Sequence, residues 1–213
     1  MLADRYTTAV SVCPTYCSFC TRSYAVGANT ETVTKTSFKP TRRRWEEVFA
    51  YIERSPQLQD IVISGGDSYY LNSEHIGLIG DRLIDIPHIR RFRFASKGLA
   101  VEPGRILDPE DGWMDAIVRV SAKAKAAGKS MAIHTHFNHP SEISWITEEA
   151  SQKLLEAGVT VRNQSVLLRG VNDNVETMSA LIRGLADINI IPVSRALALY
   201  SFVSQEHLTN VLM

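Results

Sequence analysis

All three cysteines of the chain lie within eight consecutive positions near its beginning, as Cys13, Cys17 and Cys20. Three residues separate the first two cysteines, and two residues separate the last two. A short loop with this spacing can present its thiolates to three irons of a cubane [4Fe–4S] cluster. The fourth iron then has no protein thiolate, because the sequence contains no further cysteine.

The open coordination sites of that fourth iron predict a ligand from outside the protein. S-adenosylmethionine is the candidate, because a reduced cluster can pass it one electron and release a 5′-deoxyadenosyl radical. Phe19, which directly precedes the third cysteine, is expected beside the cluster or the adenine ring. The cysteine loop therefore favours radical chemistry started by a cluster and S-adenosylmethionine.

Clustered cysteines have two other common uses, a structural zinc site and a disulfide. Structural zinc needs four nitrogen or sulfur ligands, usually in two separated pairs, and this sequence has no second pair. A disulfide would leave one thiol over, and the first residues lack the apolar core of a signal peptide. We therefore expect a reducing compartment, either cytoplasm or mitochondrial matrix. Zinc remains the alternative to the cluster.

Composition describes one globular domain rather than a binder of charged polymers. Hydrophobic residues make up 45% of the chain, and 23 basic side chains balance 23 acidic ones. Such a balance gives no reason to expect nucleic acid or a membrane surface as a partner. The sequence also has no apolar run long enough to span a bilayer.

Apolar runs of strand length alternate with helical patterns along the chain. Strands are predicted at 6–12, 60–64, 89–95, 130–137, 159–168 and 190–193, and helices at 42–55, 72–84, 112–127, 147–157 and 175–187. This alternation is typical of an α/β fold with a parallel sheet and right-handed crossovers. Unusual polar residues follow the strands, which favours a partial (β/α)6 barrel of the TIM type over a doubly wound sheet.

Three groups of polar residues lie within, at the end of or directly after predicted strands. Gly65-Gly66-Asp67 could offer backbone groups to the methionine part of the cofactor, although an ordinary strand-to-helix turn explains it as well. His134, His136 and His139 invite a metal site, but we favour His136 and Asn138 as hydrogen-bond donors at the mouth of the barrel. The amides of Asn163 and Gln164 need partners, which a cofactor or bound water could supply.

Four motifs in this order resemble the lysine 2,3-aminomutase family of radical SAM enzymes. They are Cys-x3-Cys-x-Phe-Cys-Thr-Arg, Ile-Ser-Gly-Gly-Asp, Thr-His-Phe-Asn-His-Pro and Asn-Gln-Ser-Val-Leu-Leu-Arg-Gly-Val-Asn-Asp. The resemblance divides the chain into a radical SAM core domain, 1–192, and a divergent tail, 193–213. It implies a partial barrel, the cluster, S-adenosylmethionine and pyridoxal phosphate. The implied activity is that of an isomerase, an aminomutase that moves the amino group of an α-amino acid from C2 to C3.

The resemblance also implies roles for single residues. The three cysteines match the cluster ligands, and Arg22 matches the arginine that pairs with the substrate carboxylate. Arg5 resembles a ligand of the phosphate of pyridoxal phosphate. The remaining cofactor-facing positions are Gly65, Gly66, Asp67, His136 and Gln164. A flavodoxin or ferredoxin would be the one-electron reductant, and a homo-oligomer is left open.

The sequence departs from the family after Pro192. The family continues with an aspartate that binds the side-chain amine of the substrate and with the lysine that binds pyridoxal phosphate, whereas the last lysine here is Lys153. Lys97 also replaces an arginine of the family. We therefore expect a chain truncated at its C-terminus, with no catalytic residue assigned and no substrate specified. The alternative is an inactive fragment, or a module that binds a cluster or zinc without aminomutase activity.

Overall fold

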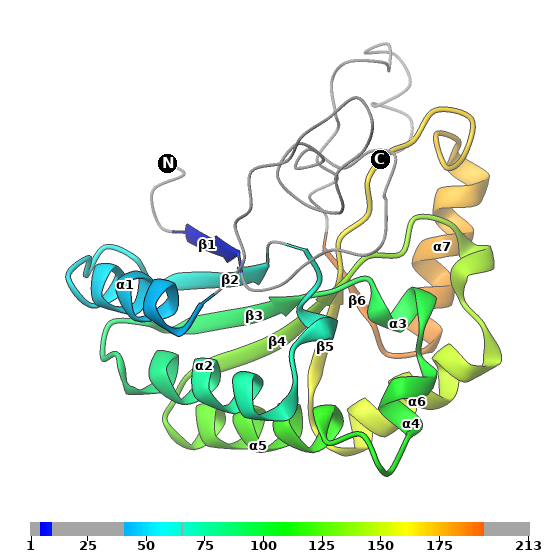
Figure 1. Cartoon of the computed structure of the whole chain (residues 1–213). Helices are drawn as coiled ribbons and strands as arrows, with labels where there is room; N and C mark the ends of the chain where they lie inside the picture. The colour runs from blue at the N-terminus through cyan, green and yellow to red at the C-terminus, as the bar shows by residue number, and fades with distance from the viewer. Residues whose placement is uncertain (1–4, 10–40, 65, 194–213) are drawn as a thin grey trace, which may run out of the picture. The chain divides into compact units, whose positions relative to one another are not determined.

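The computed structural model describes residues 5–9, 41–64 and 66–193 (Figure 1), and for residues 5–9 it describes the backbone. Two compact units are present, and each is described by itself. Unit 1 comprises Met1–Ser96 and Gly112–Ala132, and unit 2 comprises Lys97–Asp111 and Ile133–Met213. None of the helices in the described ranges is long and apolar enough to cross a membrane.

Unit 1 contains the first strands of a parallel sheet. They are β1 (Arg5–Ala9), β2 (Asp60–Ser64), β3 (Arg91–Ala95) and the first half of β4 (Ser130–Thr135), in that order. Strand β1 pairs in parallel with β2, and β2 pairs in parallel with β3. The α/β class and the parallel pairing predicted from the sequence are therefore confirmed.

The helices of unit 1 are α1 (Arg42–Glu53), the 3-10 helix η1 (Ser68–Tyr70), α2 (Ser73–Asp85) and α5 (Trp113–Ala126). Side chains cap the first turns of α1, η1 and α2, whereas α5 begins after Gly112 without such a cap. Thr41 accepts a hydrogen bond from the amide of Arg44, and Asn72 accepts one from the amide of His75. Gly128 follows α5 with a φ of 68°, which a residue with a Cβ rarely adopts. These caps explain why the sequence located the helices well.

The core of unit 1 lies on one face of its strands. Ile61 and Ile63 of β2 are fully buried, and they are surrounded by the apolar sides of α1 and α2, with Trp45, Phe49, Ile52, Ile79 and Leu83. The alternate position Asp60 is also buried, and its carboxylate is paired with Arg93 and Arg91 of β3. This alternation leaves the polar side chains of β2 and β3 on the face away from these helices.

Helices α2 and α5 pack closely side by side within unit 1 (Figure 1). Gly80 of α2 makes the approach possible, because a Cβ built at this position would lie 2.5 Å from Cγ1 of Val120. The next residue of α2, Asp81, accepts hydrogen bonds from Arg119 and Lys123 of α5. These ion pairs lower the pKa of Asp81 although its partial burial acts to raise that pKa. The contact therefore depends on a small residue and on charge.

Unit 2 contains the second half of β4 and the remaining elements. They are α3 (Gly98–Val101), α4 (Gly104–Leu107), η2 (Pro140–Glu142), α6 (Trp145–Glu156), β5 (Thr160–Asn163), α7 (Val175–Asp187) and β6 (Ile191–Pro192). Strand β5 pairs in parallel with β6, and the strand order is β4-β5-β6. Ser144 and Asn174 cap α6 and α7, and Gly158 ends α6 with a φ of 69°.

Two features of unit 2 differ from the sequence prediction. The strand predicted at 159–168 ends at Asn163, because asparagine side chains rather than a neighbouring strand bind the amides of Val166 and Leu168. Helices α3 and α4 were not predicted, since four residues each are too few to show a helical pattern.

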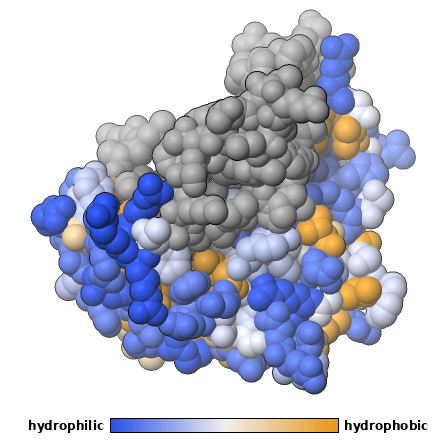
Figure 2. All heavy atoms as spheres, in the orientation of Figure 1, coloured by the Kyte–Doolittle hydropathy of each residue, from blue (hydrophilic) through white to orange (hydrophobic). Residues whose placement is uncertain are grey.

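The face drawn in Figure 2 is mostly hydrophilic, with apolar side chains in small separate patches among the described residues.

Candidate cofactor-binding site

In unit 2 the ends of β4 and β5 lie next to each other. The amide of Gln164 donates a hydrogen bond to the carbonyl of Thr135, with 3.0 Å between the nitrogen and the oxygen. His136 and Gln164 are therefore neighbours at the carboxyl ends of parallel strands, where α/β proteins place their ligand-binding groups. Both side chains are half-buried. The structure thus brings together two of the predicted site residues.

The buried amide of Asn163 is satisfied within the protein. Its Oδ1 accepts from the amide of Phe137 at 2.7 Å, and its Nδ2 donates to the Phe137 carbonyl at 3.1 Å and to Oγ of Ser165 at 2.9 Å. The sequence left a cofactor or water as the partner of this amide. The structure shows instead that Asn163 ties the end of β5 to the segment after β4.

Asn138 and Asn172 hold the loop that follows β5. Oδ1 of Asn138 accepts from the amide of Val166, while Nδ2 of Asn172 donates to the carbonyls of Asn138 and Val166. Oδ1 of Asn172 also accepts from the amide of Leu168. Asn138 is 4% exposed. The side-chain oxygen of Asn138 is therefore an acceptor in a buried structural network, and the expected donation of hydrogen bonds into the mouth stays a prediction.

Lys97 and Glu142 form an ion pair beside His136. The ammonium nitrogen of Lys97 lies 2.6 Å from Oε1 of Glu142 and 2.9 Å from the carbonyl oxygen of His136. The other carboxylate oxygen of Glu142 accepts from the amides of Asn138 and His139. Burial acts to raise the pKa of Glu142, but these hydrogen bonds and the charge of Lys97 lower it below its usual range.

The imidazole of His136 is predominantly uncharged at neutral pH. Burial and the positive charge of Lys97 lower the pKa of His136 below its usual range, and they outweigh the backbone hydrogen bond with Gln164 and the charge of Glu142, which raise it. A neutral imidazole has one donor and one acceptor nitrogen. His136 can therefore orient a polar ligand without adding charge.

In unit 1 the predicted turn after β2 has a local structural role. Oδ1 of Asp67 accepts from the amide of Tyr69 at 2.9 Å and so caps η1. The hydroxyl of Ser68 donates to the carbonyl of Ala95 at the end of β3. Asp67 is 5% exposed, and Gly66 forms a bend before it. The turn thus fixes the chain where β2 ends, as an ordinary strand-to-helix connection would.

Most of the proposed cluster site lies outside the described residues. These positions are Cys13, Cys17, Phe19, Cys20, Arg22 and Gly65. Arg5 begins β1 opposite Asp60, and its side chain is not described. Within the described ranges, no group of three histidine, cysteine or acidic side chains could hold a metal ion. The assigned roles of these residues stay predictions.

The sequence did not predict the pair of Lys97 and Glu142, or the role of Asn172. One signal was present, because Glu142 stands three residues after His139, the spacing of a capping box. Lys97 stands 45 residues before Glu142 along the chain, and no local pattern connects residues at that separation.

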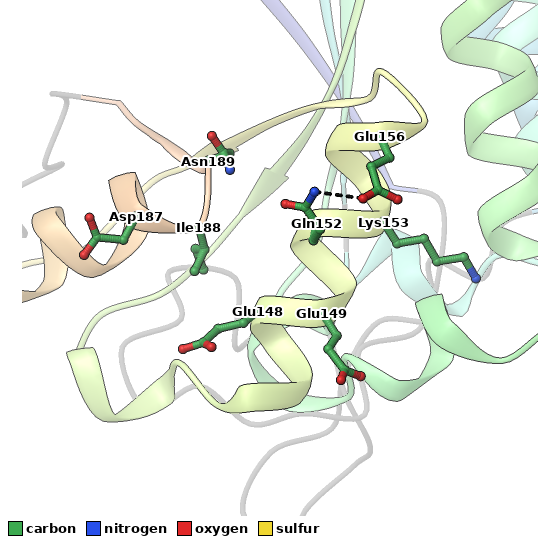
Figure 3. A pocket seen from close by; sticks show the side chains of 8 residues that line it. All are labelled: Glu148, Glu149, Gln152, Lys153, Glu156, Asp187, Ile188 and Asn189. Atoms are coloured by element: carbon green, nitrogen blue, oxygen red, sulfur yellow. Dashed lines mark hydrogen bonds between the residues drawn. The ribbon is translucent and has the colours of Figure 1, made fainter.

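A hollow of about 460 Å³ also lies in unit 2, between α6 and the end of α7 (Figure 3). Its lining consists of Glu148, Glu149, Gln152, Lys153, Glu156, Asp187, Ile188 and Asn189. Gln152 donates to Glu156, and Lys153 donates to the carbonyl of Ile106. None of the predicted site residues lines this hollow.

The fold and site define an α/β protein whose polar groups follow parallel strands. No family model matches the sequence. The chain is 35% identical over 181 residues to L-lysine 2,3-aminomutase of Clostridium subterminale, and 31% identical over 180 residues to the protein of that name in Escherichia coli. It is also 31% identical over 180 residues to glutamate 2,3-aminomutase of Clostridioides difficile.

These alignments cover 85%, 84% and 84% of this chain, but 39%, 47% and 38% of the respective relatives. The chain belongs to the lysine 2,3-aminomutase family. It spans less than half the length of the curated relatives it matches.

Proposed function

We propose that this chain is the radical SAM core of a 2,3-aminomutase, an isomerase, with a partial (β/α)6 barrel. The observation that carries the proposal is the identity of 31–35% over 84–85% of the chain to relatives named as 2,3-aminomutases. Those names specify lysine for some relatives and glutamate for another. The proposed substrate class is therefore an α-amino acid, with Arg22 binding its carboxylate.

Three thiols in one loop fit a [4Fe–4S] cluster, and Cys13, Cys17 and Cys20 would hold it. The cluster and S-adenosylmethionine together would supply one-electron cleavage of a sulfur–carbon bond. Flavodoxin or ferredoxin would deliver the electron in a reducing compartment. The chain itself would bind the cofactor, hold it in one orientation and exclude water from it.

The described residues support an orienting role for His136 and Gln164. The amide of Gln164 is bonded to the carbonyl of Thr135, the residue before His136, and the ring of His136 is hydrogen-bonded to the backbone of Gln164. Because the ring is uncharged and half-buried, it can bind a polar group of the cofactor at small desolvation cost. Asp67, Gly65 and Gly66 would bind the methionine part, and Phe19 would pack beside the adenine or the cluster.

We assign no lysine of this chain to pyridoxal phosphate. Lys153, the last lysine in the sequence, donates to the carbonyl of Ile106, and Lys97 is paired with Glu142. The acceptors of the chain already engage both of these amines, so neither is free to attack the aldehyde of pyridoxal phosphate. We expect borohydride treatment with pyridoxal phosphate to attach no cofactor at Lys97 or Lys153, as measured by mass spectrometry of the peptides.

Anaerobic reconstitution tests the proposed function directly. The chain should take up about four irons and four sulfides, and it should cleave S-adenosylmethionine when dithionite is added. Variants in which Cys13, Cys17 or Cys20 is replaced by alanine should lose the cluster while the fold, followed by circular dichroism, persists. A folded protein that takes up zinc and no iron would instead support the zinc-binding module.

A further inference from the structure

Lys97 binds two acceptors that lie close together in the segment after β4. Its ammonium group donates to the carbonyl of His136 and to the carboxylate of Glu142, and the exposed fractions of the Lys97 and Glu142 side chains are 17% and 27%. Holding a lysine in this way costs rotamer freedom. The partial burial makes the pair stronger than an exposed ion pair of the same geometry.

Side chains hold every backbone polar group from the carbonyl of His136 to the amide of His139. Lys97 binds the first carbonyl, and Glu142 binds the amides of Asn138 and His139. Asn163 and Ser165 bind the amide and carbonyl of Phe137, and Asn172 binds the carbonyl of Asn138. Lys97 and Glu142 are the charged members of this set. The segment that carries His136 is therefore fixed before any ligand arrives.

The charged groups around His136 come from two elements. Lys97 precedes α3, and Glu142 belongs to η2, while the residue after β5 contributes the backbone of Gln164. Lys97 acts to lower the pKa of His136, whereas Glu142 and the Gln164 backbone act to raise it. Burial adds to the effect of Lys97, so the uncharged ring prevails at neutral pH.

We propose that Lys97 is a positioning residue for His136. Its ammonium group anchors the His136 carbonyl to Glu142, and so presents an uncharged imidazole at a fixed place and orientation to the bound cofactor. This role rests on the proposed function, because it requires a ligand at His136. The ligand group that contacts the ring is then an uncharged hydrogen-bonding group, because only a charged imidazole would favour an anion.

An NMR titration of the full chain without cofactors tests the anchoring. Lys97→Met should raise the pKa of His136, because the substitution removes the positive charge and leaves Glu142 unneutralised. It should also speed hydrogen exchange at the amides of Asn138 and His139. Lys97→Arg should keep the pKa of His136 low. Lys153→Met is the matched control, since Lys153 also donates to a carbonyl in unit 2 but has no effect on His136.

The affinity of the reconstituted protein for S-adenosylmethionine, measured by calorimetry, tests the consequence for binding. Lys97→Met should weaken binding about tenfold, while Lys97→Arg and Lys153→Met should bind like the wild type. An unchanged pKa of His136 together with unchanged affinity in Lys97→Met would overturn the proposal. If the wild-type chain binds no cluster, the proposed function fails, whereas the titration still decides the role of Lys97.

Should Lys97→Met fail to fold, Glu142→Gln provides a variant of nearly the same shape. Removal of the negative charge should lower the pKa of His136 further, a shift opposite in sign to that of Lys97→Met. A rise or no change in this variant would contradict the proposed arrangement of charges.

Discussion

Replacing Gly80 by alanine should destabilise unit 1, although alanine favours a helix. The added Cβ would lie 2.5 Å and 2.7 Å from the two methyl carbons of Val120, well inside van der Waals contact. Val120 is fully buried, and its β-branched side chain has one strongly preferred rotamer in a helix, so it cannot move aside easily. Overpacking of this kind costs about 1–3 kcal/mol.

Helix propensity offsets part of that cost. Alanine is about 1 kcal/mol more favourable than glycine inside a helix. Gly80→Ala should therefore lower the free energy of unfolding by up to about 2 kcal/mol. Gly77 provides the control in the same helix, because its added Cβ would meet the guanidinium end of Arg119, which is flexible and half-exposed. Gly77→Ala should raise the free energy of unfolding by about 0.5–1 kcal/mol.

Urea unfolding followed by far-ultraviolet circular dichroism measures both effects. The double variant Gly80→Ala, Val120→Ala should be less destabilised than the sum of the single variants, because removing the methyl groups makes room for the new Cβ. A Gly80→Ala protein as stable as Gly77→Ala, or strict additivity in the double variant, would refute the close contact between α2 and α5.

Three further predictions concern the segment around His136. The pKa of His136 in the folded chain is below its usual 6.5, so between the folded and the unfolded pKa the unfolded chain binds more protons. The free energy of unfolding should therefore fall as the pH drops below 6.5. Urea titrations at several pH values should show a flatter pH dependence for His136→Gln. The pKa of the Glu142 carboxyl is also lowered in the folded chain, so this group should contribute fully to the free energy of unfolding above pH 4.5. The contribution should disappear as the pH falls through the folded pKa, and Glu142→Gln should remove this part of the pH dependence. Asn172→Ala should cost about 2–4 kcal/mol of unfolding free energy because it strands buried backbone groups, whereas alanine at the exposed Arg169 should cost under about 0.5 kcal/mol.

The sequence predicted regular elements best where a cap or a buried run marked both ends. The strand 60–64 and the helix 175–187 have the predicted bounds, and Asn174 caps the helix. The strand predicted at 159–168 is too long, because Val166 and Leu167 are apolar and buried like strand residues. The hydrogen bonds that end the strand come from Asn138 and Asn172, whose roles appear in no local pattern.

The site was predictable in part. The sequence placed His136 and Gln164 within two successive predicted strands, and the structure places them directly after the ends of β4 and β5. The ion pair of Lys97 and Glu142 depends on the fold itself, since it joins the residue before α3 to a 3-10 helix beyond the next strand. The cysteine loop, which is the strongest sequence signal, lies outside the described residues and stays a prediction.

Asparagine side chains fix the backbone of the loop after β5, whereas other residues form most of the exposed surface of that loop. Asn138, Asn163 and Asn172 carry the hydrogen bonds, whereas Arg169 and Val171 are exposed. A saturation library across this stretch should therefore show intolerant asparagines beside permissive neighbours. Substitutions at the exposed positions can therefore change the surface chemistry of such a loop while its backbone conformation stays the same.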